Sequence, residues 1–579
     1  MRKFIVSMLL MTVMSITSWA QGWPENYDGV MLQGFYWDSY TDTQWSNLEA
    51  QADDMAPYFK LIWVPNSAYA GSLSMNMGYH PIYWFDHKSA FGTEDALRSM
   101  IRTFKEKGTG FIEDVVINHR LGVSSWTDFP AETVNGVTYQ LTSDDICSDD
   151  EAASNGYAVG KNKDTGGTWG GARDLDHLSD NVQKNVIAYL RYLIDDLGYV
   201  GFRYDYVKGY APKFTGLYNS TVNPQFSVGE CWDNLTTVRN WIDGTITNGK
   251  IQSAAFDFPM KDIINNAFAN NNWGALAGEC LATSAGFDRF AVTFVDNHDT
   301  GRPKSDGGNP LYANIEAANA FILTMPGTPC VWLSHWKSYK VAIKKLILTR
   351  KACGVHSQST ILDRKSVSGG FLLTVKGTKG NMRVLFGNPT GVDMSGYQLA
   401  VEGTNYKCYA SEGVDLSALS EVKDDTESFV APEFCVVNEG EVCAFFEAPQ
   451  TWTAAIKCWA WDSGNYTGGS WPGVTCALVG TAANKNKVYK WTWNGNYTGT
   501  TATQPQFIIF SNNGTPQTSD MDFKNGGYYN ASGLQGVVTG IGDVVYDNPK
   551  HQTVYNLQGQ RVDNQYKGVV IVQGKKMIR

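Results

Sequence analysis

The fold is decided by the stretch Gly201-Phe202-Arg203-Tyr204-Asp205-Tyr206-Val207-Lys208-Gly209, an apolar strand that ends in a charged cluster. Three other apolar runs end in the same way, at residues 118–119, at Glu230 and at residues 296–299. Parallel strands bring their carboxyl ends to one edge of a sheet. The four runs therefore predict a parallel sheet with one polar pocket at that edge.

Strands and helices alternate along the first 356 residues. Residues 30–35, 61–66 and 111–117 read as strands, and a helix with apolar residues at helical spacing follows Thr93. This alternation predicts an α/β fold, a closed (β/α)8 barrel over residues 21–356. A stretch rich in Gly, Asp and Asn interrupts it at residues 118–178, which predicts a small domain inserted after the third strand.

The predicted pocket holds three carboxylates, Asp205, Glu230 and Asp299. Cleavage of a glycosidic bond with retention needs a carboxylate nucleophile and a protonated carboxylic acid roughly 5–5.5 Å apart. A third acid can stabilise positive charge on the sugar ring. The alternative is that each acid only caps a strand or forms a local ion pair, but four polar strand ends in one sheet favour a shared site.

Composition restricts the partners. A chain of 579 residues is too long for one core. Its net charge of −10 argues against nucleic acid or an anionic membrane as the main partner. The 19 tryptophans suit stacking on sugar rings, so a neutral polysaccharide remains compatible.

The amino terminus predicts a secretory signal peptide over residues 1–20, with a basic start, a short apolar run and a small-residue cleavage site at Ala20. A membrane anchor is the alternative, but the apolar run is too short, and we expect no membrane span elsewhere. We expect secretion to the medium or the cell surface, with the periplasm as a transit compartment. The ten cysteines have irregular spacing, and some should be free and buried.

Beyond the barrel the pattern becomes β-rich. Short alternating strands predict an antiparallel β domain and linker at residues 357–440, and a tryptophan-rich β-sandwich follows at residues 441–535. Residues 536–579 form a tail.

Four segments, residues 114–119, 201–209, 228–232 and 294–299, resemble the signature regions of the α-amylase family, glycoside hydrolase family thirteen. The resemblance is closest to plant-type and related bacterial α-amylases. Further matches lie at residues 32–37, 78–79, 174–177 and 326–329.

The resemblance implies retaining hydrolysis of α-1,4-glucan bonds in starch, glycogen and maltooligosaccharides. It gives Asp205 the role of nucleophile, Glu230 that of acid and base, and Asp299 that of stabilising the distorted sugar. The substrate-binding residues that it implies are Tyr79, His119, Arg203, Lys208, Trp232 and His298. For Tyr79, the alternative is an ordinary packing role in its loop.

The resemblance also implies a calcium ion that docks the inserted domain. Its ligands would be the side chains of Asn118, Asp164 and Asp174 and the carbonyl groups of Gly167 and Gly209. The alternative is that these residues only form turns.

Residues 441–535 resemble a starch-binding module of carbohydrate-binding family twenty-six. The implied binding set is Trp459, Trp461, Trp471 and Gln517, while other tryptophans of the module should fill its core. Residues 536–579 resemble a sorting tail of the bacterial type IX secretion pathway, with a terminal β-hairpin as the alternative.

Three functions remain open from sequence. The first is an α-amylase, with starch as its partner, acting as a monomer. The second is a related α-1,6-debranching enzyme or glucanotransferase. The third is a catalytically inactive surface glycan-binding protein, against which the intact carboxylates Asp205, Glu230 and Asp299 argue.

Overall fold

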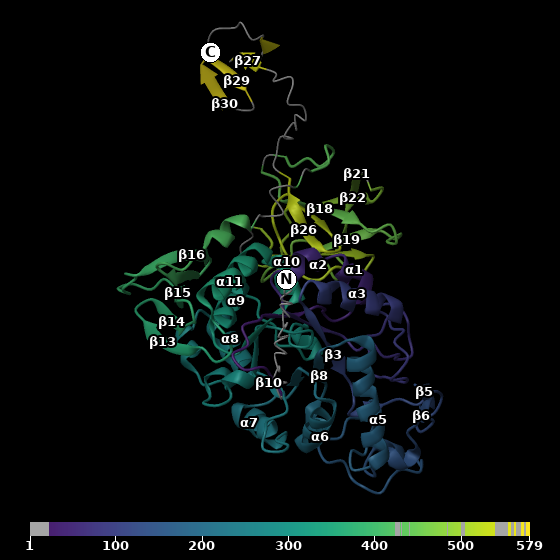
Figure 1. The fold of residues 1–579 in the computed structure, drawn as a ribbon. Helices are drawn as coiled ribbons and strands as arrows, with labels where there is room; N and C mark the ends of the chain where they lie inside the picture. Colours follow the sequence, from purple (N-terminus) through teal and green to yellow (C-terminus); the bar gives the residue numbers. More distant parts are fainter. Residues whose placement is uncertain are drawn as a thin grey trace, which may run out of the picture. The chain divides into compact units, whose positions relative to one another are not determined.

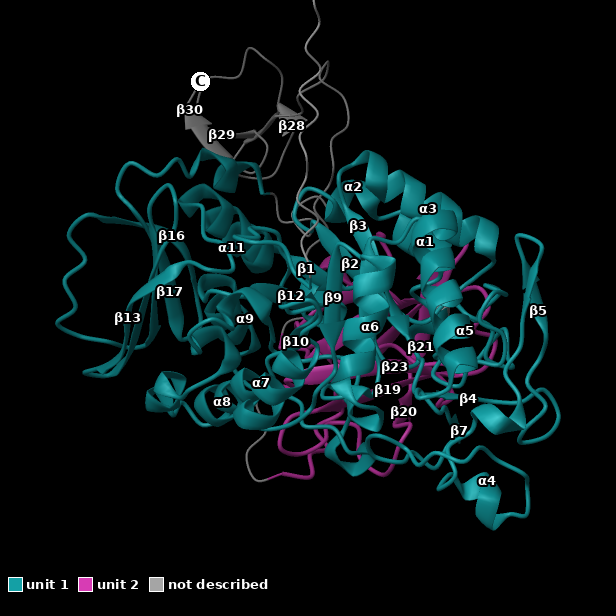
Figure 2. Cartoon of the chain, turned by 60° about the horizontal axis from the view of Figure 1, so that its bottom comes forward, with its two compact units in different colours: residues 1–424 teal, residues 425–579 magenta. Residues whose placement is uncertain are grey.

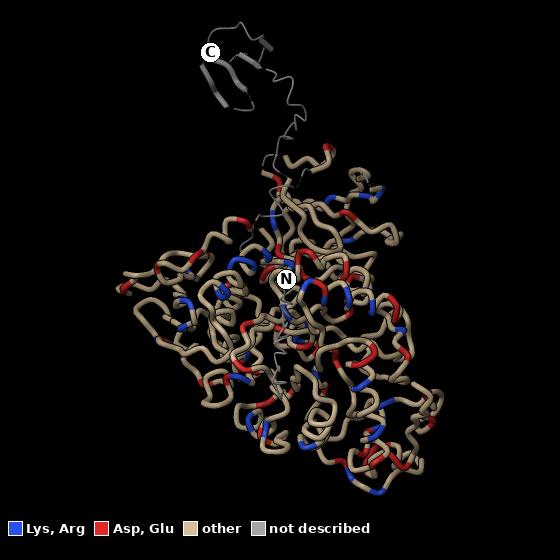
Figure 3. The backbone as a smooth tube through the Cα atoms, viewed as in Figure 1, with Lys and Arg blue, Asp and Glu red and all other residues tan. Residues whose placement is uncertain are grey.

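The computed structural model describes residues 22–422, 429, 431–438, 440–482, 484–499 and 504–538, with the backbone of four short strands between 554 and 578. The chain divides into two compact units, residues 1–424 and 425–579 (Figure 2). Acidic and basic residues are interspersed along the described chain (Figure 3). The predicted signal peptide, residues 1–20, lies outside the described residues.

Within the described part of the first unit, eight parallel strands close into a barrel in the order β1-β12-β11-β10-β9-β8-β3-β2, which confirms the predicted (β/α)8 fold. Their residues are almost all buried. Helices cover the outer face of the barrel (Figure 1). The strands are β1 (Met31–Gln33), β2 (Leu61–Val64), β3 (Gly110–Val115), β8 (Gly201–Tyr204), β9 (Phe226–Gly229), β10 (Ala254–Phe256), β11 (Ala291–Phe294) and β12 (Thr328–Trp332).

The helix predicted after Thr93 is α3 (Glu94–Glu106). The Thr93 side chain accepts a hydrogen bond from the Ala96 backbone N–H, and the apolar face of the helix is buried. The other α-helices are α1 (Trp45–Glu49), α2 (Ala52–Met55), α4 (Glu151–Ser154), α5 (Asp180–Arg191), α6 (Pro212–Val222), α7 (Leu235–Gly244), α8 (Phe258–Ala269), α9 (Ile315–Thr324), α10 (Leu333–Ser338) and α11 (Lys340–Cys353).

The segment between β3 and β8 has little regular structure. Strand β4 (His119–Arg120) pairs with β7 (Arg173–Asp174), and β5 (Glu132–Val134) forms a hairpin with β6 (Val137–Tyr139) at the edge of the unit (Figure 1). The β4–β7 pairing returns the chain to the carboxyl end of β3, which places the inserted segment beside the predicted pocket.

A five-stranded antiparallel sheet follows the barrel, in the order β13-β14-β15-β17-β16. It lies beside α9 and α11 (Figure 2). Its strands are β13 (Thr360–Val367), β14 (Gly370–Lys376), β15 (Asn381–Gly387), β16 (Tyr397–Gly403) and β17 (Tyr406–Ser411).

The second unit is a β-sandwich with two sheets, β21-β22-β18-β25-β26 and β20-β19-β23-β24. Phe446 and Phe510 stack in its core with ring centroids 4.6 Å apart. The strands are β18 (Cys443–Ala448), β19 (Ile456–Trp461), β20 (Val474–Thr475), β21 (Ala477–Thr481), β22 (Lys487–Thr492), β23 (Phe507–Asn512), β24 (Met521–Asp522), β25 (Gly527–Asn530) and β26 (Gly533–Val537).

Of the tail, the described backbone forms a separate sheet of β27 (Val554–Asn556), β28 (Arg561–Val562), β29 (Val569–Val572) and β30 (Lys575–Ile578). The rest of the predicted sorting tail lies outside the described residues. All ten cysteines are described, and each is buried with a free thiol, which confirms the expectation of free buried cysteines. No helix in the described ranges has the length and apolar character needed to cross a bilayer.

Candidate active site

A buried arginine gathers the carboxylates at the carboxyl ends of three adjacent strands. Nη1 of Arg203, on β8, lies 2.5 Å from Oδ1 of Asp114 and 2.7 Å from Oδ1 of Asp205. Its Nη2 lies 3.0 Å from Oε2 of Glu230. The guanidinium presents several fixed donors in one plane, so a single side chain orients acids from β3, β8 and β9.

Asp205 and Glu230 face one space. Both side chains bind the same guanidinium. The distance between their bound oxygens therefore cannot exceed the width of the guanidinium plus the two N···O distances of 2.7 and 3.0 Å. This upper limit admits the roughly 5–5.5 Å separation of the two acids in retaining glycosidases. Their side chains are 13% and 12% exposed, against 1% for Arg203, so the acids line the opening and the cation lies behind them.

Glu230 is electrostatically suited to hold a proton. Burial is the largest influence on its pKa and raises it; Arg203 opposes this rise, while Asp205 and Asp299 add to it. The resulting pKa is about 8, so the carboxyl group is protonated at neutral pH. A protonated acid beside an ionised one is the pair that retaining cleavage needs.

Asp299 lies just beyond β11, beside His298. Nε2 of His298 is 3.1 Å from Oδ2 of Asp299 and 2.5 Å from the Tyr79 hydroxyl oxygen. Burial, followed by the charge of Arg203, holds the pKa of His298 well below its usual value, so the ring is neutral. With the Gln33 amide donating to Nδ1 over 2.9 Å, the ring proton sits on Nε2, which faces both the Tyr79 hydroxyl and Asp299.

Asp114 is a member of the site that the sequence analysis did not single out. It is fully buried, pairs in register with Arg203 across β3 and β8, and accepts hydrogen bonds from the Tyr79 hydroxyl at 3.0 Å and Trp63 Nε1 at 3.3 Å. Burial raises its pKa to about 7 against the opposing charge of Arg203. Asp114 is the penultimate residue of β3 and lies inside the apolar run that ends at residues 118–119, so the polar end of that run does not include it.

Two aromatic side chains that the sequence analysis did not assign complete the walls. Trp169, from the inserted segment, stacks on His119 with centroids 4.1 Å apart. Trp37 is parallel to Tyr79 at 5.9 Å. The Nε2 atom of His119 is 2.8 Å from the Tyr79 carbonyl oxygen, so His119 and Tyr79 are neighbours in the pocket.

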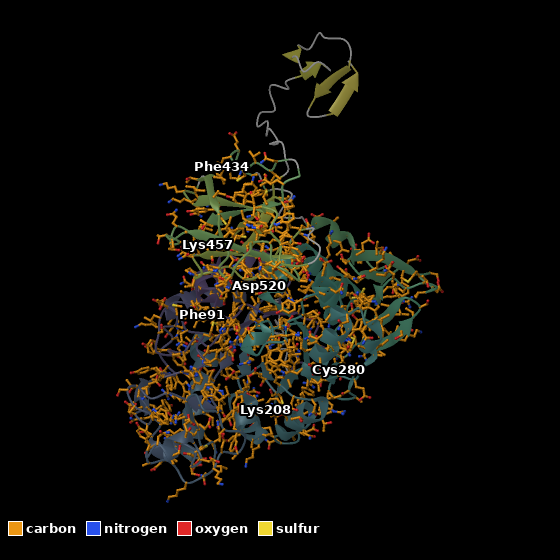
Figure 4. The ribbon with its side chains drawn as sticks, turned by 180° about the vertical axis from the view of Figure 1, so that it is seen from behind. Phe91, Lys208, Cys280, Phe434, Lys457 and Asp520 are labelled. Atoms are coloured by element: carbon orange, nitrogen blue, oxygen red, sulfur yellow. The ribbon has the colours of Figure 1, made fainter. Side chains whose placement is uncertain are left out.

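Lys208 and Trp232 lie at the rim. Nζ of Lys208 (labelled in Figure 4) donates to the Trp232 carbonyl oxygen over 2.9 Å and pairs with Asp233 at 3.2 Å. The Trp232 side chain stacks on Phe258 at 5.1 Å and leaves 39% of the residue exposed. Lys208 and Trp232 therefore give this part of the rim a cation and an accessible indole.

The predicted calcium ligands are brought close together. Nδ2 of Asn118 is 3.1 Å from Oδ1 of Asp174, and a Cβ at Gly209 would lie 2.0 Å from Oδ1 of Asn118, a close approach that requires glycine. The backbone N–H of Gly167 donates to the Lys208 carbonyl oxygen, next to Gly209, over 2.9 Å.

The charges around these ligands fit a hard cation. Burial, followed by the charges of Asp164 and Asp150, raises the pKa of Asp174 to about 7. Oδ2 of Asp164 is buried with no hydrogen-bond partner in the described structure. Among the described residues no group of three or more His, Cys, Asp or Glu side chains is arranged for a metal. Two carboxylates combined with amide and carbonyl oxygens form the kind of donor set that calcium accepts.

In the second unit, Trp459 and Trp461 alternate on β19 with the buried Cys458 and Ala460, so both indoles lie on the outer face of the sheet. Trp471 is 42% exposed and meets Trp459 at 6.3 Å with the rings inclined by 67°. Gln517 is exposed, and its backbone forms an antiparallel β-bridge with Ser511 of the neighbouring strand β23. Trp491, in contrast, is buried in the core.

Comparisons with known proteins agree with this division. The family model "Starch-binding module 26" matches residues 444–523. Over 65% of its length the chain is 31% identical to "Probable alpha-amylase 2" of Arabidopsis thaliana, and it covers 92% of that protein. It is 30% identical to the "Glucan 1,4-alpha-maltotetraohydrolase" of Stutzerimonas stutzeri, with 65% of this chain and 72% of that protein covered.

A solved structure shares the barrel fold. The ligand-free cyclic alpha-maltosyl-(1-->6)-maltose hydrolase of Arthrobacter globiformis aligns with a TM-score of 0.51 at 15% identity, over 66% of this chain and 99% of that one. At that identity the likeness concerns the fold alone.

Proposed function

The chain belongs to the α-amylase family, and we propose from this that it hydrolyses α-1,4-glucosidic bonds in starch, glycogen and maltooligosaccharides with retention of configuration. The observation that carries the proposal is the ion-paired arrangement of Asp205, Glu230 and Arg203 at the ends of adjacent strands. Two acids on one guanidinium supply the nucleophile and the proton donor that the reaction needs.

Asp205 acts as the nucleophile. Its Oδ1 accepts a charge-assisted hydrogen bond from Arg203 over 2.7 Å, which orients the carboxylate. It attacks the anomeric carbon while the glycosidic bond breaks, and a covalent glycosyl ester forms on its carboxylate.

Glu230 protonates the departing glycosidic oxygen and then deprotonates the water that hydrolyses the ester. The charge of Asp205 contributes to the raised pKa of Glu230. Esterification removes that charge, so the pKa of Glu230 falls when the group must change from acid to base.

Asp299 and His298 bind hydroxyl groups of the sugar at the cleavage point, and the carboxylate favours the positively charged transition state. Tyr79 and His119 line the same subsite, and Lys208 and Trp232 bind the leaving-group side at the rim. Arg203 orients the carboxylates from behind.

Asn118, Asp164 and Asp174, with the carbonyl groups of Gly167 and Gly209, would hold a calcium ion. When bound there, the ion would supply positive charge between the inserted segment and the ends of the barrel strands. The buried, unpartnered oxygen of Asp164 supports this assignment.

The second unit binds starch through the tryptophans and amide of its outer face, Trp459, Trp461, Trp471 and Gln517. Flat apolar rings suit sugar faces, and the amide can bind hydroxyl groups. We further propose that the protein acts as a monomer and is secreted or displayed at the cell surface after cleavage near Ala20. The basic and apolar pattern of residues 1–20 supports the export proposal.

One set of assays tests the proposed function. Reducing sugar should be released from soluble starch, and proton NMR of the first products should detect the α-anomer before mutarotation. Product profiles on amylose, pullulan and maltotriose separate an α-amylase from a debranching enzyme or a glucanotransferase. Starch binding with no release of reducing sugar would instead support the inactive glycan-binding protein.

A further inference from the structure

A buried ion pair lies beneath the segment that carries Asp299. Nζ of Lys261, on α8, is 2.6 Å from Oδ1 of Asp296, which follows β11. The two side chains are 2% and 1% exposed, and neither has a role in the mechanism above. A buried ion pair is a poor source of net stability, because the cost of removing both charges from water offsets their attraction.

The Lys261–Asp296 pair is hydrogen-bonded near both ends of residues 297–311. Oδ1 of Asp296 accepts a hydrogen bond from the Thr300 hydroxyl at 3.0 Å, and Oδ2 accepts one from the Leu311 backbone N–H at 3.1 Å. Lys261 also donates to Oδ1 of Asn265 at 2.7 Å, and the Asn265 amide donates to the Asn309 carbonyl oxygen at 2.8 Å.

Thr300 connects this pair to the backbone of Asp299. Its hydroxyl accepts a hydrogen bond from the Asn297 backbone N–H over 2.9 Å. Oδ1 of Asn297 in turn accepts hydrogen bonds from the backbone N–H groups of Asp299 at 2.9 Å and Thr300 at 2.7 Å. A continuous series of hydrogen bonds therefore runs from Lys261 to the residue that bears the third carboxylate.

A second side chain faces the same carboxylate. Nε2 of His335 lies 3.8 Å from Oδ2 of Asp296, and Nδ1 of His335 is 3.3 Å from the Asn319 amide nitrogen. With the amide donating to Nδ1, the ring proton is on Nε2, the nitrogen nearer to Asp296. Asp296 thus accepts hydrogen bonds from Lys261 on α8 and from its own segment, and the His335 ring of α10 lies nearby.

We propose that Lys261 and Asp296 are positioning residues that hold Asp299 in its catalytic orientation through Thr300 and Asn297. The inference rests on the proposed function, because it assigns a purpose to the placement of Asp299. Asp299 lies outside any strand, so strand pairing does not fix it, and its side chain is 26% exposed at the pocket. Transition-state stabilisation requires such a group to be held before the reaction begins.

The alternative is that the pair only stabilises the barrel, and the kinetic constants separate the two roles. Lys261→Met should lower kcat on soluble starch by about 10²-fold, the size expected for a small misplacement of a catalytic group, with KM changed less than about threefold. Lys261→Arg should restore most of kcat. Lys344→Met is the control, because it removes another lysine ion pair, that of Lys344 on α11 with Asp54 at 2.5 Å. The side chains of Lys344 and Asp54 are 9% and 31% exposed, and Asp54 also keeps Lys340 as a partner at 3.0 Å.

Thr300→Val keeps the ion pair and removes only the hydroxyl link, so it serves if Lys261→Met does not fold. We expect the same direction, a lower kcat with little change in KM. Wild-type kcat in a folded Thr300→Val or Lys261→Met variant would overturn the proposal.

A double-mutant cycle gives the decisive result. In an Asp299→Asn background, assayed at high enzyme concentration on an activated aryl maltooligoside, Lys261→Met should cause no further loss of kcat beyond about twofold. An equal loss in both backgrounds would show that Lys261 does not act through Asp299, while leaving the proposed function intact. Wild-type activity of Asp299→Asn alone would instead contradict the proposed function.

Discussion

The pocket of the barrel is lined by buried charged side chains, whereas the tryptophan face of the second unit is made of half-buried and exposed aromatic side chains. The pocket has buried, ion-paired carboxylates with pKa values of about 8 for Glu230 and about 7 for Asp114. The second face has half-buried and exposed indoles on one sheet, and Trp471 is 42% exposed. Bond cleavage needs charge held in place away from water, whereas binding a sugar polymer needs flat apolar surface that the polymer can reach.

The largest effect should come from removing the charged groups of the pocket. Asp205→Asn or Glu230→Gln should lower turnover of soluble starch by several orders of magnitude, because each removes the nucleophile or the proton donor. Adsorption to starch granules, measured by depletion from solution, should remain at the wild-type level. Wild-type turnover in either folded variant would contradict these roles.

Removing calcium should lower the stability and activity of the first unit and should leave starch binding by the tryptophan face unchanged. Chelation should lower the thermal midpoint of the first unit and its activity, because a ligand that binds only the folded state at one hundred times its Kd contributes about 2.7 kcal/mol to the free energy of unfolding. Calcium should restore both and magnesium should not, since magnesium demands a smaller octahedral site. Differential scanning calorimetry with and without chelator measures this, and an unchanged midpoint would argue against the site.

Removing indoles of the tryptophan face should instead weaken starch binding and leave hydrolysis of soluble substrates nearly unchanged. Trp459→Ala and Trp471→Ala should each weaken granule binding by about tenfold or less, in the range of single aromatic truncations at interfaces. Hydrolysis of short soluble maltooligosaccharides should stay within about twofold of wild type. Trp491→Phe is the matched control, because Trp491 is buried in the core of the same unit. Equal losses of granule binding in the control would show a folding defect rather than lost contacts.

The smallest expected effect is a shift in pH dependence. Glu230 must be protonated to act as acid, so kcat/KM should fall as pH rises through about 8. The charge of Asp299 raises the pKa of Glu230, so in Asp299→Asn the residual activity should fall at a lower pH than in wild type. Granule binding should be flat over this interval. If the variant loses activity at the same alkaline pH as the wild type, the charge of Asp299 does not influence the pKa of Glu230, which would contradict this account.

Much of the fold could be predicted from the sequence because buried parallel strands are written as apolar runs with polar ends. The run that ends at Asp205 and the helix after Thr93 are examples, and both occur in the structure. The positions of Asp205, Glu230 and Asp299 follow from the same pattern, since each lies at or just beyond a strand end.

What could not be predicted depends on register and on irregular loops. Asp114 becomes part of the site because it pairs with Arg203 across β3 and β8, and a register between distant strands is not visible in local sequence. Trp169 covers His119 from a loop without periodicity. The link from Lys261 to Asp299 joins α8 to the segment after β11, and only the packed structure brings these residues together.

The most direct test of the central claim is to trap the covalent intermediate. The enzyme is incubated with a 5-fluoro-α-maltosyl fluoride, digested and mapped by mass spectrometry. We predict a single 5-fluoromaltosyl adduct, formed with loss of the anomeric fluoride, in the peptide that contains residues 201–209, located on Asp205 and absent from Asp205→Asn. An adduct on another residue, or hydrolysis that releases the β-anomer with no adduct, would contradict the assignment of Asp205 as nucleophile beside Glu230.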